Sequence, residues 1–315
     1  MQLKKMIIFI VSILLIGGIV FIYLVGNFVF NSSVNLVSNE ETKINRRSQL
    51  TQMGMNYDEF YSKYKVEEIS IKSSFDGHLI PADYIYTNKN SNVVILVHGL
   101  GSNRLSTYPV SEVFLRNGYN VIAYDQRSSG ENYAKYNTFG VLESRDLADY
   151  VSYAKERVGP NSKLGIWGVS FGGATTGIYL GNKETTDLVD FAILDSPLSS
   201  MRYMIETGVH ELGLVLHPKF MTFCGNIVTK IRLGFSYDDA EVKKKIKDTL
   251  VPIMVINSKA DKLTPYFMGK EIYDAVYKAE KEIYTVEDSG HAAILGGHPR
   301  EYEKNVVEFI QTKSA

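Results

Sequence analysis

The sequence predicts an α/β protein built on a largely parallel sheet and preceded by one membrane-spanning helix. From about residue 66 to the C-terminus, β-rich apolar runs alternate with helix-like segments, which is typical of parallel βαβ units. Several of the runs are apolar throughout, as strands buried on both faces require. The stretch Met6–Phe30 carries no charge and consists mainly of large apolar residues. With 45% hydrophobic and 22% charged residues, the whole chain has a globular composition.

The N-terminal apolar stretch is long enough to cross a bilayer. As a helix, Met6–Phe30 would run about 37 Å, against a hydrocarbon core of about 30 Å. A cleaved signal peptide is the alternative, but its apolar region usually has only about 7–15 residues and ends at a small-residue site. The sequence Gly26–Phe30 matches such a site poorly. We therefore predict an uncleaved membrane anchor over residues 1–30.

The charges that flank the anchor predict its orientation. Lys4 and Lys5 precede the apolar run, whereas the other side stays uncharged until Glu40. Positive charge next to a span tends to remain in the cytoplasm. This predicts a single-pass protein of the cell membrane with the rest of the chain outside the cytoplasm, although Lys43 and two arginines that follow it count against that orientation.

Residues 31–65 are polar, contain a helical segment around Gln49–Tyr64, and are expected to form a stalk or linker. Residues 66–315 are expected to form the catalytic domain, which opens with a hairpin around Phe75-Asp76-Gly77. The strands are predicted at Val66–Ser73, Leu79–Tyr86, Val93–Val97, Asn120–Tyr124, Lys163–Trp167, Phe191–Leu194, Ile253–Ile256 and Glu282–Val286. The helices between and after them are predicted near Pro109–Asn117, Leu142–Arg157, Gly172–Leu180, Pro265–Ala279 and Glu301–Thr312.

The alternation of strands and helices stops between Pro197 and Val251, where the sequence contains only helix-like apolar and basic segments. An insertion of this kind predicts a helical cap over residues 198–250, above an active site. Its many methionine, leucine and phenylalanine side chains would suit an acyl or aromatic substrate. Apolar residues at helical spacing are, however, more often the core of the segment itself.

The segment Gly168-Val169-Ser170-Phe171-Gly172 matches the pattern G-x-S-x-G, with a predicted strand before it and a predicted helix after it. In that context the pattern indicates a sharp turn that lifts the serine hydroxyl above the sheet, with glycines where side chains would collide. The alternative is a glycine-rich turn that only packs or cradles a phosphate. We predict that Ser170 is a nucleophile.

A serine hydroxyl needs a base and an acid that orients the base. Asp261 follows the strand Ile253–Ile256 and is the predicted acid, with helix capping as its structural alternative and Asp195 as the reserve candidate. His291 follows the last strand and is the predicted base, in preference to His298. Catalytic groups gather at the carboxyl edge of a parallel sheet, and this favours His291.

A glycine-containing turn, His98-Gly99-Leu100-Gly101, directly follows the strand Val93–Val97. The backbone N–H groups of Leu100 and Phe171 are the predicted donors of an oxyanion hole, since losing one such donor typically weakens transition-state binding by about 2.7–4 kcal/mol. A glycine turn without a ligand is the alternative interpretation.

From about Val66 to the C-terminus the chain resembles the α/β-hydrolase superfamily. Asp125-Gln126-Arg127, followed by Thr138-Phe139-Gly140 and Glu143, is similar to a bacterial branch of uncharacterised members that often carry an N-terminal hydrophobic segment. The resemblance implies a mostly parallel sheet of eight strands with helices on both faces, a cap after strand six, and a Ser170–Asp261–His291 triad. The chain departs from many relatives at Ser128-Ser129, where they have a glycine or a histidine.

Together these features predict a serine hydrolase that cleaves a carboxylic ester. The alternatives are a serine peptidase using the same residues, and a non-catalytic binding protein on the same fold. A further possibility is partner recognition through residues 31–65. We expect no cofactor and no metal, because the sequence has no H-E-x-x-H, CxxC or Walker-type pattern. With a formal net charge of −1, we expect a small-molecule ester or short acyl or peptide substrate and no nucleic acid.

Overall fold

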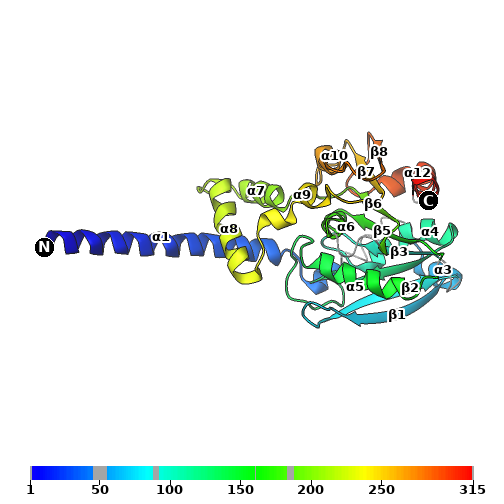
Figure 1. Cartoon of the computed structure of the whole chain (residues 1–315), viewed down its shortest axis with the longest axis horizontal. Helices are drawn as coiled ribbons and strands as arrows, with labels where there is room; N and C mark the ends of the chain where they lie inside the picture. The colour runs from blue at the N-terminus through cyan, green and yellow to red at the C-terminus, as the bar shows by residue number, and fades with distance from the viewer. Residues whose placement is uncertain (1, 45–54, 88–91, 160, 183–187, 314–315) are drawn as a thin grey trace. The chain divides into compact units, whose positions relative to one another are not determined.

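The computed structural model describes residues 2–44, 55–87, 92–159, 161–182 and 188–313, and Figure 1 traces them from blue at the N-terminus to red at the C-terminus. Eight strands form one sheet in the order β1-β2-β4-β3-β5-β6-β7-β8. Their bounds are β1 Lys65–Lys72, β2 Leu79–Tyr86, β3 Asn92–Val97, β4 Tyr119–Tyr124, β5 Leu164–Val169, β6 Phe191–Asp195, β7 Ile253–Ser258 and β8 Lys281–Val286.

The sheet is mostly parallel, as the sequence predicts. Strands β1 and β2 pair antiparallel with each other, and β2 pairs antiparallel with β4, whereas β3 to β8 pair in parallel. In this order β4 lies between β2 and β3. The chain therefore steps back from β3 to β4 and then crosses to β5 on the other side of β3. The central strands are buried on both faces, which explains their continuous apolar sequences.

Helices cover both faces of the sheet. The helices that lie between and around the strands are α3 Tyr57–Lys63, η1 Arg104–Thr107, α4 Tyr108–Arg116, α5 Glu143–Lys155, α6 Phe171–Leu180, α9 Val242–Ile246, α10 Tyr266–Ala275, α11 Ile294–Gly297 and α12 Pro299–Lys313. On one face, α3, α4 and α12 contribute large side chains to a common core with the sheet, among them Phe60, Phe114 and Phe309. On the other face, Tyr150 of α5 stacks on Tyr124 of β4, and α6 packs against β5 and β6.

The predicted strands and helices differ from the structure mainly at their ends. The prediction for Pro265–Ala279 is too long, because Val276 is already extended and α10 ends at Ala275. Of the predicted helical segment Gln49–Tyr64, residues 49–54 lie outside the described residues, and the remainder contains α3. Such differences are expected, since helix ends depend on local caps more than on periodicity.

By its contacts the chain divides into two compact units, Met1–Leu36 with Met201–Asp239, and Val37–Ser200 with Ala240–Ala315. The second unit contains the sheet. The first contains α1 Gln2–Val34 and the helices after β6, α7 Met201–Glu211 and α8 Pro218–Leu233. These are the helices that the sequence predicts as a cap, and in this unit α8 lies against α1 (Figure 1). The 3₁₀ turn η3 Tyr237–Ala240 ends the segment.

Small residues allow α1 and α8 to pack closely. A Cβ on Gly26 of α1 would lie 2.4 Å from the carbonyl oxygen of Cys224, and a Cβ on Gly225 would lie 2.5 Å from the Val29 side chain. Phe21 stacks on Phe220 nearby. Among the described residues, the N-terminal helical stretch is long and apolar enough to cross a membrane, and its most apolar window is exposed. The predicted domain division at residues 30 and 65 stays a prediction.

Candidate active site

Ser170 lies on a strained turn between β5 and α6. Its φ of 56° and ψ of −116° place it in a backbone region that residues with a side chain rarely adopt. A Cβ on Gly168 would lie 2.3 Å from the carbonyl oxygen of Gly172, and a Cβ on Gly172 would lie 2.0 Å from that of Val97. The Ser170 N–H donates to the carbonyl oxygen of Asp195 at 2.8 Å. The two glycines of the pattern therefore allow the close packing that holds the turn in place.

The structure brings the predicted nucleophile, base and acid together. His291 Nε2 is 2.9 Å from Ser170 Oγ, and His291 Nδ1 is 2.8 Å from Asp261 Oδ2. The three residues follow β5, β7 and β8, whose carboxyl ends meet at one edge of the parallel sheet. Because a carboxylate only accepts hydrogen bonds, the Nδ1 of His291 carries the proton, and its Nε2 is free to accept from the serine hydroxyl.

Asp261 is held by its own loop as well as by the histidine. Its side chain is 1% exposed, and its Oδ1 accepts from the N–H groups of Leu263 at 2.9 Å and Thr264 at 3.0 Å. The Thr264 hydroxyl lies 2.9 Å from Oδ2. Burial acts to raise the pKa of Asp261, but the hydrogen bonds from His291 and Thr264 outweigh it, so the pKa lies below its ordinary value. The carboxyl is therefore ionised at neutral pH.

The two rival candidates have other partners. Asp195 accepts from the hydroxyls of Tyr302 at 2.8 Å and Ser196 at 3.0 Å. Burial raises the pKa of Asp195 to about 6, an effect that these two hydrogen bonds offset only in part. His298 Nε2 pairs instead with Asp288 Oδ1, 2.8 Å away on the exposed surface.

The two predicted oxyanion donors belong to segments beside Ser170. Phe171 is the first residue of α6, so its N–H has no acceptor within the helix. Gly99 passes so close that a Cβ on it would lie 3.4 Å from Ser170 Cβ. Leu100 follows it in the same turn and is half-buried. The orientation of these N–H groups toward a bound substrate stays a prediction.

Sequence reasoning missed three side chains that support the site. Thr264 contacts Asp261, the carbonyl oxygen of Ser196 and His291, at 2.9, 2.9 and 3.1 Å. Its position three residues after the aspartate is a local signal that could have indicated it. Tyr302 reaches Asp195 from α12 with no local signal at all. Gln126 belongs to a motif that the sequence does show, but its partners lie far away in the chain.

Comparisons with known proteins agree with this architecture. A family model described as the alpha/beta hydrolase fold matches residues 92–215, which include the glycine turn after β3 and the serine turn after β5. The protein YqkD of Bacillus subtilis (strain 168), which is itself uncharacterised, is 25% identical over 304 residues that cover 95% of this chain and 96% of YqkD. An Escherichia coli 31.7 kDa protein from the traX-finO intergenic region is 23% identical and matches 65% of this chain and 85% of its own length.

Solved structures share the fold at low identity. The Pyrococcus furiosus esterase Pf2001 superposes with a TM-score of 0.64 at 23% identity, covering 83% of this chain and 98% of that chain. The Pyrococcus horikoshii acylaminoacyl peptidase superposes with a TM-score of 0.58 at 17% identity, covering 82% of this chain and 44% of that chain. Such likeness establishes the fold and, with the family model, supports a hydrolase activity. The chain therefore has the alpha/beta hydrolase fold, and its residues 92–215 match the model of that family.

Proposed function

We propose that this chain is a serine hydrolase that cleaves a carboxylic ester through an acyl-enzyme. The observation that carries the proposal is the continuous hydrogen-bonded series from Ser170 Oγ through His291 to the buried Asp261 carboxylate. A serine hydroxyl within hydrogen-bond distance of an imidazole that is itself paired with a carboxylate has what nucleophilic catalysis needs. That a solved neighbour is described as an esterase supports the choice of an ester over other acyl substrates.

In the proposed reaction, Ser170 Oγ attacks the ester carbonyl carbon while its proton passes to His291 Nε2. Asp261 stabilises the resulting imidazolium, and the carbonyl oxygen, now negative, receives hydrogen bonds from the N–H groups of Leu100 and Phe171. As the tetrahedral intermediate collapses, the alcohol leaves with the proton from His291. A water molecule then loses a proton to the same nitrogen, attacks the acyl-enzyme and releases the carboxylic acid, which restores Ser170.

We also propose that α1 anchors the protein in the cell membrane, with the catalytic unit outside the cytoplasm. The exposed apolar surface of α1 supports the anchor, and Lys4 and Lys5 support the orientation. The charges in residues 43–47 act in the opposite sense. Accessibility of an added C-terminal tag to protease in intact cells tests the orientation, and a protected tag would reverse it.

The function is tested on the full chain in detergent with a fluorescent fluorophosphonate, which phosphonylates activated serines. We expect the parent to be labelled and to hydrolyse p-nitrophenyl esters, Ser170→Ala to do neither, and His291→Ala to lose both. His298→Ala serves as the matched control because it removes the other histidine of the C-terminal region and should keep the parent's rate. A series of acyl lengths and a p-nitroanilide separate ester from amide cleavage. A folded parent that is neither labelled nor active would refute the proposal and favour a binding protein.

A further inference from the structure

One buried side chain connects the two segments that carry the proposed oxyanion donors. Gln126 follows β4 and is 1% exposed. Its Nε2 donates to the carbonyl oxygen of His98 at 2.6 Å, at the start of the turn that carries Leu100. Its Oε1 accepts from the Thr175 hydroxyl at 2.7 Å, in the helix whose first residue is Phe171. The length of this side chain therefore sets the separation between the two segments.

His98 makes the same connection rigid from the other side. Its Nδ1 lies 2.8 Å from the carbonyl oxygen of Gly99, and its Nε2 accepts from the backbone N–H of Gln126 at 2.9 Å. The ring therefore donates through Nδ1 and accepts through Nε2, which requires the neutral form. Burial lowers the pKa of His98 and so favours that form. Both the side chain and the carbonyl group of His98 are thus tied to Gln126.

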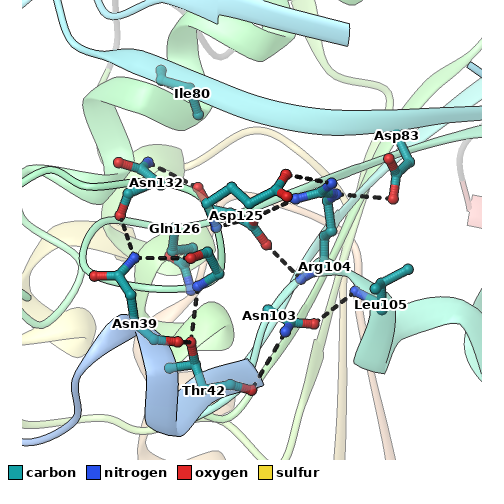
Figure 2. Close-up of polar contacts among 12 residues, drawn as sticks. Asn39, Thr42, Ile80, Asp83, Asn103, Arg104, Leu105, Asp125, Gln126 and Asn132 are labelled. Carbon is teal, nitrogen blue, oxygen red and sulfur yellow. Dashed lines mark hydrogen bonds and ion pairs between the residues drawn. The ribbon is translucent and has the colours of Figure 1, made fainter. Parts of the chain in front are cut away.

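The loop that carries Gln126 is itself held by a cluster of buried charges, which Figure 2 shows. The Asp125 carboxylate accepts from the N–H groups of Arg104 at 2.8 Å and Glu131 at 2.9 Å, and it pairs with the Arg104 guanidinium. The side-chain amide of Asn132 donates to the Asp125 carbonyl oxygen at 2.9 Å. Gly130 has a φ of +53°, and a Cβ there would lie 2.3 Å from the Asp125 carboxylate. The loop therefore wraps closely around this one carboxyl group.

A short segment that follows the N-terminal helix in the chain, residues 39–42, is hydrogen-bonded to this loop (Figure 2). Thr42 is fully buried, and its hydroxyl accepts from the N–H of Gly130 at 2.9 Å. The side-chain amide of Asn39 donates to the carbonyl oxygens of Gly130 at 3.0 Å and Asn132 at 2.9 Å. The Thr42 hydroxyl in turn donates to the Asn39 carbonyl oxygen at 2.6 Å, and Asn103 donates to that of Thr42 at 3.4 Å. All these residues belong to the unit that contains the sheet.

We propose that Asn39 and Thr42 are positioning residues for the oxyanion hole. They fix the loop 125–132, and through Gln126 this loop fixes the spacing between the turn at His98 and α6. The inference rests on the proposed function of Ser170. If it holds, the segment that begins a few residues after α1 influences turnover indirectly, through the loop 125–132, although the segment contacts no reacting atom.

The expected effect is on the chemical step. An oxyanion donor works only when it lies about 2.7–3.1 Å from the developing negative oxygen, and complete loss of one donor reduces kcat by about 10²–10³. A displacement of about 1 Å caused from a distance can reduce the rate by about 10². We expect Gln126→Leu, which removes both connections, to approach that value. Thr42→Val, which removes only the hydroxyl, is expected to lower kcat by about tenfold.

The experiment compares Thr42→Val with Thr42→Ser, which keeps the hydroxyl, in the full chain in detergent. Thr312→Val is the matched control, because Thr312 is exposed on α12 and its hydroxyl donates to the Glu308 carbonyl oxygen of its own helix. Active sites are counted by fluorophosphonate titration, and kcat per titrated site, KM and the inhibition constant of an aryl trifluoromethyl ketone are measured. In that adduct Ser170 Oγ bonds to the ketone carbon, its proton passes to His291, and the ketone oxygen becomes the oxyanion.

We expect Thr42→Val to lower kcat per site and to weaken ketone binding by the same factor, with KM unchanged and Thr42→Ser and Thr312→Val close to the parent. The inference is overturned if Thr42→Val keeps the parent's kcat per site, since a purely structural role would reduce only the number of titratable sites. It is also overturned if Thr42→Ser is as impaired as Thr42→Val. If the parent itself is neither labelled nor active, the proposed function fails and this inference falls with it.

Discussion

Replacing Asp261 by Asn is expected to reverse the proton arrangement of His291 rather than only to remove a charge. Two backbone N–H groups, from Leu263 and Thr264, point at Oδ1 of Asp261. In the Asp261→Asn variant the amide oxygen must therefore take the Oδ1 position, since an NH₂ group there would face two donors. The NH₂ group then points at His291 Nδ1 and donates to it. The ring proton moves to Nε2, which faces Ser170 Oγ 2.9 Å away and can no longer accept the serine proton.

The size of the effect follows from the tautomer. An Asn in place of a triad Asp that keeps the geometry but fixes the wrong tautomer reduces kcat by about 10⁴, equivalent to about 5.4 kcal/mol of transition-state stabilisation. Asp261→Ala is expected to retain more activity than Asp261→Asn, because His291 Nδ1 can then still donate to the Thr264 hydroxyl, 3.1 Å away. The order Ala above Asn is therefore specific to this arrangement of donors.

The assay is the rate of p-nitrophenyl ester hydrolysis by the parent and both variants, normalised to folded protein. Asp288→Asn is the control, since it alters the exposed carboxyl that pairs with His298 and should leave the rate unchanged. A loss of less than tenfold for Asp261→Asn, or an Ala variant slower than the Asn variant, would refute the reasoning. The orienting acid of His291 would then have to be another carboxyl, with Asp195 as the first to test.

Two further predictions concern the stability of the site. The buried Asp195 has its pKa raised from 3.8 to about 6, so its protonated form stabilises the fold below pH 3.8 and that contribution is lost as the pH rises through about 6. Asp195→Asn stays neutral, so its free energy of unfolding is expected to exceed that of the parent by up to about 3 kcal/mol at pH 8, and the difference should vanish near pH 4. Denaturant titration of both proteins at the two pH values measures this difference. A difference that grows toward acidic pH would contradict the prediction. Gly172→Ala is expected to destabilise the chain by about 1–3 kcal/mol or more, because the new Cβ would lie 2.0 Å from the Val97 carbonyl oxygen. Gly296→Ala is the control and should not destabilise the chain, because nothing lies within 4 Å of a Cβ at that position. Equal denaturation midpoints for the two alanine variants would refute the packing argument.

Much of the fold could be predicted because its signals are local. The strands buried on both faces show as apolar runs, and the turn at Ser170 shows through the glycines that its close packing requires. The candidate residues Asp261 and His291 could be predicted because each closely follows a strand. The end of α10 could not be predicted, because it depends on the extended backbone of one residue, Val276.

Long-range hydrogen bonds had no such signal. Nothing near Tyr302 in the sequence indicates that its hydroxyl reaches Asp195, and nothing near Thr42 indicates that its hydroxyl receives the N–H of Gly130. A polar side chain in a short segment has no periodicity that reveals its partner, since the partner is chosen by how distant elements pack. The close contact of Gly26 in α1 with α8 is hidden for the same reason.

By itself, then, the sequence determined the α/β class, the alternation of strands and helices, the apolar N-terminal helix and the three side chains proposed for catalysis, because these depend on periodicity, glycine placement and position at strand ends. The tertiary structure alone decided that Asp195 accepts from Tyr302, that Thr264 and Gln126 support the site, and that residues 39–42 close the loop 125–132. Each of those choices depends on distances between segments far apart in the chain, which only the packed sheet and its helices define.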